Sequence, residues 1–225
     1  MASMANKAVV DGDRAGLAEA QVARITAAGS SLHPHLAALL TATGATASRD
    51  LSDAVHLLCA IHGSHPGLTD LAHAASLPGE ARNWLREAAD AFDRERLYLV
   101  RLTSAIGPMP STTGAMQTEN ALLAQRHAIE TLAKSERRGC ALGAATALIQ
   151  DWRALRPLLD HAADRSSIEC PACTLPNDDS VAAVIAAGTD GVASERALAF
   201  GAEQLLLQHR GLLDLMEARA AARTD

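Results

Sequence analysis

Apolar residues recur along most of this chain at positions i, i+3, i+4 and i+7, which is the spacing of residues on one face of an α-helix. No segment shows the alternation of apolar and polar residues that a half-buried β-strand requires. The longest helical patterns run over residues 79–106, 118–165 and from about 189 to 223. Shorter patterns predict helices over 13–28, 36–44, 51–62, 68–75 and 180–188.

The pattern over residues 118–165 is too long for one straight helix in a compact domain. Its apolar face changes near Arg138-Gly139, because the stripe that begins at Leu122 is rotated around the helix axis from the stripe that begins at Ala141. The segment is therefore either one kinked helix or two helices, with the change near Gly139. Both alternatives remain open at the level of the sequence.

These patterns predict an all-α fold. We expect one helical domain over residues 1–225, a bundle of three to four long helices with short helices toward its N-terminal side. The composition agrees: 48% of the residues are hydrophobic but only 2% are aromatic, and Ala and Leu, which favour helix, supply most of the apolar side chains.

Glu95 is a carboxylate within an apolar stripe. The stripe consists of Trp84, Leu85, Ala88, Ala91, Phe92, Leu99, Leu102 and Ile106. A buried carboxylate needs a partner, because burial disfavours its charge. The loop over 107–114 is short, so we expect the helices on either side of it to be antiparallel neighbours. This predicts a partner for Glu95 between Gln125 and Glu130, with Arg126 and His127 as the candidates.

Three further helices also carry polar residues on apolar faces. His209 lies between Leu205 and Leu212, and we interpret it as a core residue that donates to a carbonyl or carboxylate. Gln125 and Glu136 interrupt the stripe before Gly139, where they can satisfy backbone groups freed by a kink.

His62 ends the predicted helix over 51–62, and His65 follows within the string HGSHPG. Two imidazoles at a helix end suit a metal ion or an anion. A histidine at the C-terminal end of a helix also commonly interacts with the helix dipole.

Inward-facing carboxylates and imidazoles are how helical bundles build di-metal sites, but the Glu-x-x-His pair that marks those sites is absent here. Glu95, His127, Glu136 and His209 are therefore only weak candidates for metal ligands. Cys170 and Cys173 have the spacing of a zinc or redox pair, but no second pair accompanies them. No cofactor is assigned.

Charge and cysteine usage restrict the partners and the compartment. The net charge is −6 with no cluster of Lys and Arg, so we expect no nucleic-acid partner. No stretch is long and apolar enough for a membrane span, and residues 1–14 do not have the pattern of a signal peptide. Four scattered cysteines predict free thiols and a reducing cytoplasm.

Several segments resemble a known family when they are taken together. They are HLLCAIHGSHPG (56–67), ERLYLVRLTSAIGPMPST (95–112), AQRHAIETLAKSERRGCALGAA (124–145) and FGAEQLLLQHRGLLDLMEAR (200–219). They resemble an uncharacterised alphaproteobacterial protein family with no assigned activity. The resemblance implies a natural single-family domain and brings no functional residues with it.

Three functions remain as alternatives. The first is a small cytoplasmic protein that binds a small molecule or a partner, with its inward polar residues lining a pocket or fixing helix register. The second is a metal-dependent, ferritin-like oxidoreductase. The third is a homodimeric adaptor, in which the small residues of 139–145 allow helices of two copies to approach closely.

Overall fold

A computed structural model describes residues 16–223, and every regular element in that range is helical, which confirms the all-α fold. Residues 16–28 form a helix; the start of the helix predicted over 13–28 and the segment tested for a signal peptide lie outside the described residues. The other elements are η1 (Ser30–Leu32), α2 (Pro34–Thr41), α3 (Gly44–His62), α4 (Leu68–Ala75), α5 (Glu80–Ala105), α6 (Ala115–Ala133), α7 (Cys140–Arg165), α8 (Asp178–Gly188) and α9 (Val192–Ala221).

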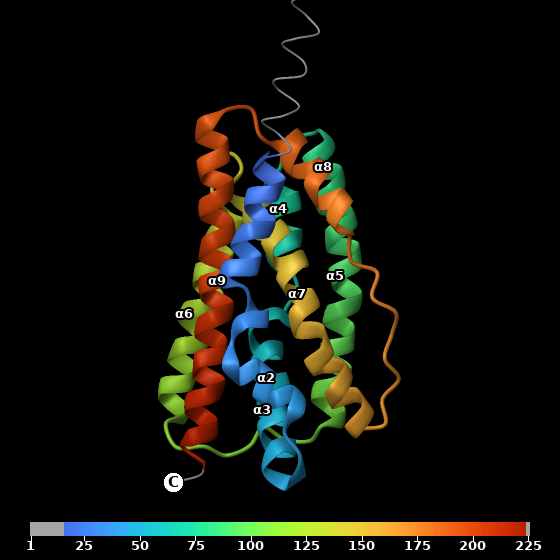
Figure 1. Cartoon of the computed structure of the whole chain (residues 1–225), viewed down its shortest axis with the longest axis vertical. Coiled ribbons are helices and arrows are strands. Elements are labelled where there is room, and N and C mark those ends of the chain that lie inside the picture. The colour runs from blue at the N-terminus through green and yellow to red at the C-terminus, as the bar shows by residue number, and fades with distance from the viewer. Residues whose placement is uncertain (1–15, 224–225) are drawn as a thin grey trace, which may run out of the picture.

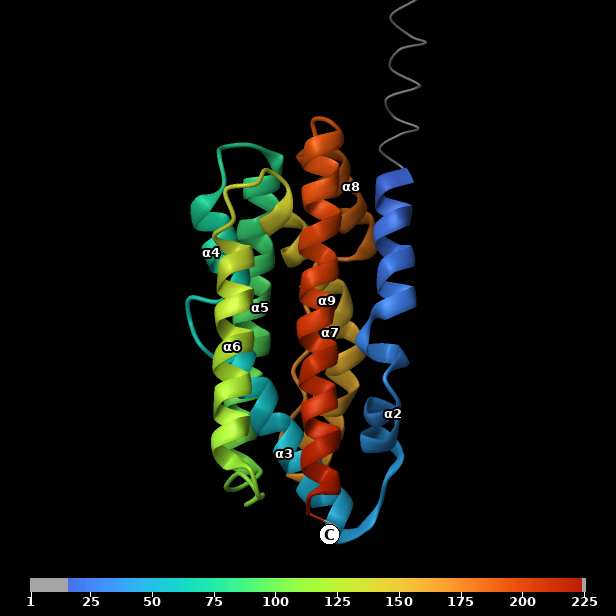
Figure 2. The ribbon, with the colours of Figure 1, turned by 90° about the vertical axis from the view of Figure 1, so that its left-hand side faces the viewer.

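Helix α7 is the centre of the bundle (Figure 1). It packs along α9 over most of its length and also contacts α3, α4, α5, α6 and α8. Its apolar residues are buried on several sides, and Trp152 is the largest fully buried side chain of the described chain. The remaining long helices therefore lie around α7, with α5 on one side and the α6–α9 pair on the other (Figure 1). Figure 2 shows α6 beside α9.

The pattern over 118–165 corresponds to two helices and not to one kinked helix. Helix α6 ends at Ala133, α7 begins at Cys140, and Gly139 at the N-cap of α7 has φ 94°, a left-handed conformation that glycine adopts without a steric penalty. The separate orientation of the two helices explains why the apolar face changes at this glycine.

The small residues of 139–145 pack inside the chain. A Cβ atom added at Gly143 would overlap the backbone carbonyl of Leu198, and one added at Gly201 would overlap the carbonyl of Cys140. The two glycines thus let the backbones of α7 and α9 touch. The close helix contact that the sequence suggested for a homodimer is made between two helices of the same chain.

Helices α5 and α6 are not neighbours, contrary to our expectation for a short loop. Within the described residues α5 packs on α3, α4, α7 and α8, whereas α6 packs on α3, α4, α7 and α9. The loop between α5 and α6 crosses the lower end of the bundle (Figure 1). Because α6 lies on the far side of α3, Arg126 and His127 do not lie beside Glu95.

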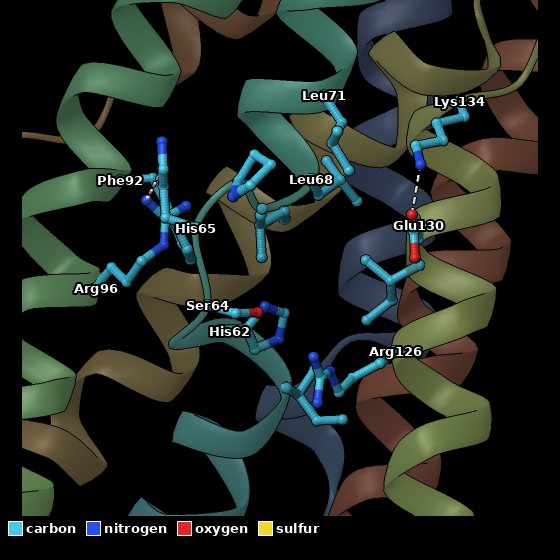
Figure 3. Close-up of a pocket in the computed structure, with 15 residues that line it drawn as sticks. His62, Ser64, His65, Leu68, Leu71, Phe92, Arg96, Arg126, Glu130 and Lys134 are labelled. Atoms are coloured by element: carbon cyan, nitrogen blue, oxygen red, sulfur yellow. Dashed lines mark hydrogen bonds and ion pairs between the residues drawn. The ribbon is translucent and has the colours of Figure 1, made fainter.

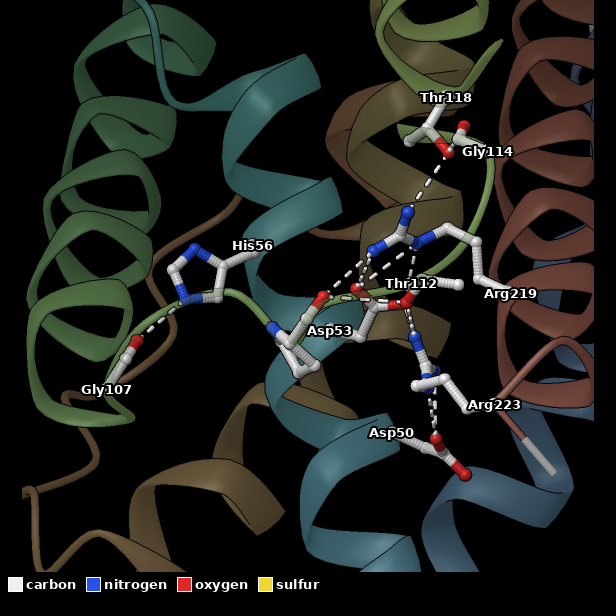
Figure 4. Close-up of polar contacts among 10 residues, drawn as sticks. Asp50, Asp53, His56, Gly107, Thr112, Gly114, Thr118, Arg219 and Arg223 are labelled. Carbon is white, nitrogen blue, oxygen red and sulfur yellow. Dashed lines mark hydrogen bonds and ion pairs between the residues drawn. The ribbon is translucent and has the colours of Figure 1, made fainter. Parts of the chain in front are cut away.

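A buried charge cluster holds this loop in place (Figure 4). Arg219 of α9 binds both carboxylate oxygens of Asp53 of α3, with its Nε 2.9 Å from Oδ2 and one terminal nitrogen 2.7 Å from Oδ1. Arg223 donates to Asp53 and, over 2.9 Å, to Thr112 in the loop. His56 contacts the carbonyl of Gly107 at 2.8 Å. The cluster ties α3, α9 and the loop together, which sets the position where α6 begins.

The described chain has no helix that is both long and apolar enough to cross a membrane. All four cysteines are free thiols, and Cys170 and Cys173 lie exposed in the segment between α7 and α8. The fold thus leaves the CxxC pair at the surface.

Candidate functional site

A cavity of about 310 Å³ lies between the end of α3 and helices α4, α5 and α6 (Figure 3). Its walls combine apolar side chains with cations and imidazoles. The apolar lining consists of Ile61, Leu68, Leu71, Phe92, Ile129 and Leu148, and the ionisable lining of His62, His65, Arg96, Arg126, Glu130 and Lys134. The volume is at the lower end of the range of small-molecule pockets.

His62 is the most buried imidazole of this lining, with 6% of its surface exposed. It is the last residue of α3, and Gly63 caps the helix directly after it. Edge-to-face contacts with Phe92 and Trp152 place the three ring centroids 4.9 to 6.1 Å apart, which fixes the plane of the imidazole.

His62 is the outer member of a buried hydrogen-bonded chain. Its Nε2 lies 3.2 Å from Nε2 of His209, and Nδ1 of His209 lies 2.6 Å from Oδ2 of Asp151. Asp151 also accepts from the backbone N–H and the hydroxyl of Ser30, at 2.7 and 2.6 Å. This hydrogen-bonded chain of side chains runs from a carboxylate inside the α7–α9 pair to the pocket.

The protonation states of the chain follow from these contacts. Burial acts to raise the pKa of Asp151, but the bonds from His209 and Ser30 outweigh it and leave the pKa below its usual value. Asp151 is therefore ionised, and His209 donates through Nδ1–H. The pKa of His62 is well below its usual value, first because of burial and then because of His209 and Arg96, so His62 is neutral.

The tautomer of His62 depends on its neighbour. Because His209 donates to Asp151 through Nδ1, the single hydrogen between the two Nε2 atoms belongs either to His62 or to His209. Nδ1 of His62, the remaining ring nitrogen, has no hydrogen-bond partner in the described chain. The pocket thus contains a ring nitrogen that is free to bond to a ligand.

The neutral state of His62 predicts that acid destabilises the fold. The folded protein holds His62 neutral while the unfolded chain protonates it below about pH 6.5, so the unfolded state binds more protons and stability falls with decreasing pH. The slope should be up to about 1.4 kcal/mol per pH unit for each such histidine. Denaturant unfolding of wild type and His62→Phe between pH 7.5 and 5 measures it.

The variant should show the shallower slope, whatever its absolute stability. Burial also lowers the pKa of His35, so His35 contributes part of the pH slope in both proteins. Burial raises the pKa of Glu95, and its contribution to the slope is the same in both proteins and cancels when they are compared. His127→Gln, at an exposed position, is the matched control and should keep the wild-type slope. Identical slopes in wild type and His62→Phe would show that His62 is not held neutral.

The cations of the pocket differ in how strongly they are already paired. Arg96 is 5% exposed, donates to Asp70 over 2.9 Å and to Asp93, and its Nε is buried without a partner. Lys134 pairs with Glu130 at 2.5 Å on the surface. Arg126 makes no hydrogen bond or ion pair within the described chain and is exposed beside the cavity (Figure 3). Arg126 is thus the cation most available to a ligand.

Two other groups of His, Asp and Glu have the spacing of a metal site within the described residues: His33, Asp214 and Glu217, and His65, Asp70 and Asp93. In the first, Nδ1 of His33 accepts from the backbone N–H of His35, so Nε2, which faces Asp214, carries the hydrogen and has no lone pair for a metal. In the second, the guanidinium of Arg96 already forms ion pairs with both carboxylates. Neither arrangement favours a metal ion.

The structure bears out the burial of Glu95 but not its expected partner. Glu95 is 1% exposed, and it pairs with Arg156 of α7 at 2.8 Å and accepts from Trp152 Nε1 at 3.0 Å. The prediction of Arg126 or His127 as the partner is wrong because α5 packs on α7 and not on α6. Through Trp152, Glu95 supports the ring that contacts His62.

The other residues singled out in the sequence lie in different places. His209 is buried and bonds to a carboxylate, as its position in an apolar stripe predicted. The side-chain nitrogen of Gln125 lies 3.4 Å from the carbonyl of Gln208, while His127 and Glu136 are exposed. Neither metal-like group contains Glu95, His127, Glu136 or His209, so the structure does not assemble the ligand set considered from the sequence.

Sequence reasoning missed the two side chains that complete the chain to His62. Asp151 lies three residues after Leu148 and four before Leu155, which is the spacing of the buried stripe of α7, so a signal was present. Ser30 lies in a short turn before α2 and carried no such signal.

Comparison with known proteins identifies a family but no function. A model for a family of unknown function (DUF6975) matches residues 25–224. The chain belongs to this family. No curated protein and no solved structure matches it. The family fits the resemblance noted from the sequence, whose alphaproteobacterial origin stays a prediction, and the function must be argued from the geometry of the pocket.

Proposed function

We propose that this protein binds a small organic anion, with a carboxylate or phosphate head and an apolar body, in the cavity between α3, α4, α5 and α6. The observation that carries the proposal is the guanidinium of Arg126, which has no hydrogen bond or ion pair in the described chain, beside a partly apolar cavity that is floored by His62. An arginine without an internal partner can give a charge-assisted hydrogen bond to an anion at little cost in lost contacts.

The charge of the lining supports an anion over a cation. Three cationic side chains but one carboxylate line the cavity, in a chain whose net charge is −6. The unpartnered Nε of Arg96 adds a buried donor at the opposite wall. The apolar residues of α4 and α6 account for the apolar body, because a ligand with a charged head alone would leave Leu68, Leu71 and Ile129 uncovered.

Titration calorimetry with phenyl phosphate, phenylacetate and inorganic phosphate tests the proposal. We expect saturable binding of at least one of the two organic anions with a dissociation constant near or below about 1 mM, and weaker binding of inorganic phosphate. Comparing the first two probes identifies the head group. Phenylacetamide, which is neutral, should not bind measurably.

Arg126→Ala should weaken binding about tenfold or more, because a hydrogen bond to a charged group contributes roughly 1.5–3 kcal/mol. Arg101→Ala is the matched control, since Arg101 is an exposed arginine of α5 outside the cavity, and it should bind like wild type. Failure of all three anions to saturate the protein at several times a millimolar concentration would overturn the proposed function.

A ferritin-like metal centre and a homodimeric adaptor have less support. The first lacks an assembled ligand set, and the second loses its main argument because the small-residue run packs α7 against α9 of the same chain.

A further inference from the structure

We propose that an anion binding in this pocket takes up one proton, which comes to rest on His209 beside Asp151 while His62 changes tautomer and donates its Nδ1–H to the anion. The inference rests on the proposed function, because it concerns the same cavity. It adds a regulation of that site, since affinity would then depend on pH through His209 and Asp151, which the anion does not contact.

The ligand-free arrangement is unsuited to an anion. In the ligand-free state that this proposal assigns, Asp151 is ionised, both imidazoles are neutral and the hydrogens point inward: His62 donates to His209, and His209 donates to Asp151. This leaves a lone pair on Nδ1 of His62, which repels an anion in the cavity. An acceptor must become a donor before the floor of the pocket can bind a negative charge.

One added proton reverses the direction of the hydrogen bond between His62 and His209. A proton from solvent adds to Nδ1 of His62, and the hydrogen on Nε2 of His62 moves across the 3.2 Å contact to Nε2 of His209. His62 is again neutral, now with its hydrogen on Nδ1. His209 becomes an imidazolium 2.6 Å from the carboxylate of Asp151, which Ser30 holds in place with two hydrogen bonds. The new positive charge is thus paired inside the bundle.

The burial of His62 favours this shared arrangement over a cation on His62 itself. Its imidazole is enclosed by Phe92 and Trp152, and a charge there would be poorly solvated. His209 is as buried, but it touches an ionised carboxylate. In this proposal the two histidines therefore share the added proton, and the proton count belongs to the pair.

Other titratable groups also face the cavity and must be separated from the pair. They are His65, Arg96, Arg126, Glu130 and Lys134 in the lining, with Asp70 and Asp93 behind Arg96. The arginines and the lysine are charged before the anion arrives. His65 is the alternative site of proton uptake, because it is exposed at the mouth and its Nδ1 already accepts from Arg96 at 3.3 Å.

Calorimetry of phenylacetate binding near pH 7 in buffers of different ionisation enthalpy counts the protons, because this probe is fully ionised and does not titrate itself. We expect uptake of close to one proton per bound anion, and an affinity that falls about tenfold per pH unit on the alkaline side. The same proton count is made with phenyl phosphate, the probe with the other head group, at a pH above the second pKa of its phosphate.

Four variants assign the proton. His62→Phe should abolish uptake, His65→Gln should keep it whatever its effect on affinity, and His127→Gln, outside the cavity, should leave both uptake and affinity unchanged. His62→Gln is the conservative change: its amide can donate to the anion and accept from His209, so it should retain part of the uptake that His62→Phe loses.

Nitrogen-15 spectra of the histidine rings in the wild-type protein make the test independent of any variant. Saturating phenylacetate should move His62 from the Nε2–H to the Nδ1–H pattern and His209 to the imidazolium pattern. Binding with a buffer-independent enthalpy and unchanged ring spectra would overturn the inference while leaving the proposed function intact. Uptake that survives in His62→Phe but is lost in His65→Gln would assign the proton to the mouth and also overturn it.

Discussion

An Arg156→Met variant is expected to lose about 3–5 kcal/mol of unfolding free energy at neutral pH, because it leaves Glu95 as a buried carboxylate without its cation. Arg156 and Glu95 are 5% and 1% exposed, and their side chains meet at 2.8 Å. The arginine also donates to Asp160 over 2.9 Å and to the carbonyl of Pro171 over 2.6 Å. Denaturant unfolding monitored by circular dichroism measures the loss.

The pH dependence of that loss identifies its cause. Burial raises the pKa of Glu95 even with the opposing bonds from Trp152 and Arg156 in place. A carboxyl whose folded pKa is raised binds more protons when folded, so its penalty is smallest in acid and grows as pH rises through the folded pKa. Without Arg156 the rise in pKa should be larger, and the variant should approach wild-type stability as pH is lowered.

Two controls accompany this prediction. Arg153→Met removes an arginine one turn earlier on α7 that pairs with Asp178 at the surface, and it should cost no more than about 1 kcal/mol. The double variant Glu95→Leu/Arg156→Met removes both charges and should recover most of the loss. An Arg156→Met protein that unfolds with wild-type stability at pH 7 would contradict the buried pairing.

Gly143→Ala and Gly201→Ala should each destabilise the protein by about 1–3 kcal/mol, because the added methyl group would overlap the backbone of the facing helix. A carbonyl group within a helix has no freedom to swing aside as a long side chain does. The α7–α9 pair would have to separate along its length, and core residues of both helices would lose contact. Thermal and denaturant unfolding measure the effect.

Gly211→Ala on α9 is the matched control. Among the described residues, the only atom close to its added Cβ is the end of the Gln125 side chain, at 3.0 Å, which can move. Alanine is the better helix former by roughly 0.5–1 kcal/mol, so this variant should be neutral or slightly more stable. If all three glycine variants behaved alike, the close approach of α7 and α9 would not be what limits substitution.

The sequence predicted the helices and the faces they bury, because a side chain's position around a helix depends only on residues within a few turns. Glu95, His209 and the change of helix at Gly139 all follow from such local patterns. The partner of Glu95 did not, because it depends on which helix lies beside α5. A short loop favours adjacent helices, but here the loop crosses the end of the bundle, where Arg219 donates to the carbonyl of Pro110 and Arg223 to Thr112.

The hydrogen-bonded residues at the pocket also show that local patterns predict burial but not which residues meet. His62, Asp151 and His209 come from three helices, and no spacing rule relates them. Asp151 could have been recognised as buried from its place in the α7 stripe, and His62 was noted as an imidazole at a helix end. Their meeting depends on tertiary packing, which the spacing of residues along the sequence does not reveal.

The backbone contact between α7 and α9 has a consequence for how such a site could diversify. Asp151 and His209 belong to the two helices whose separation is least free to change, so the distance between them is set by the scaffold. Most of the cavity lining comes from α4, α6 and the segment 64–67 between α3 and α4, none of which carries a member of the polar chain. Substitutions there would alter which molecule fits and leave the proton chemistry intact, so one inherited core could serve descendants with different ligands.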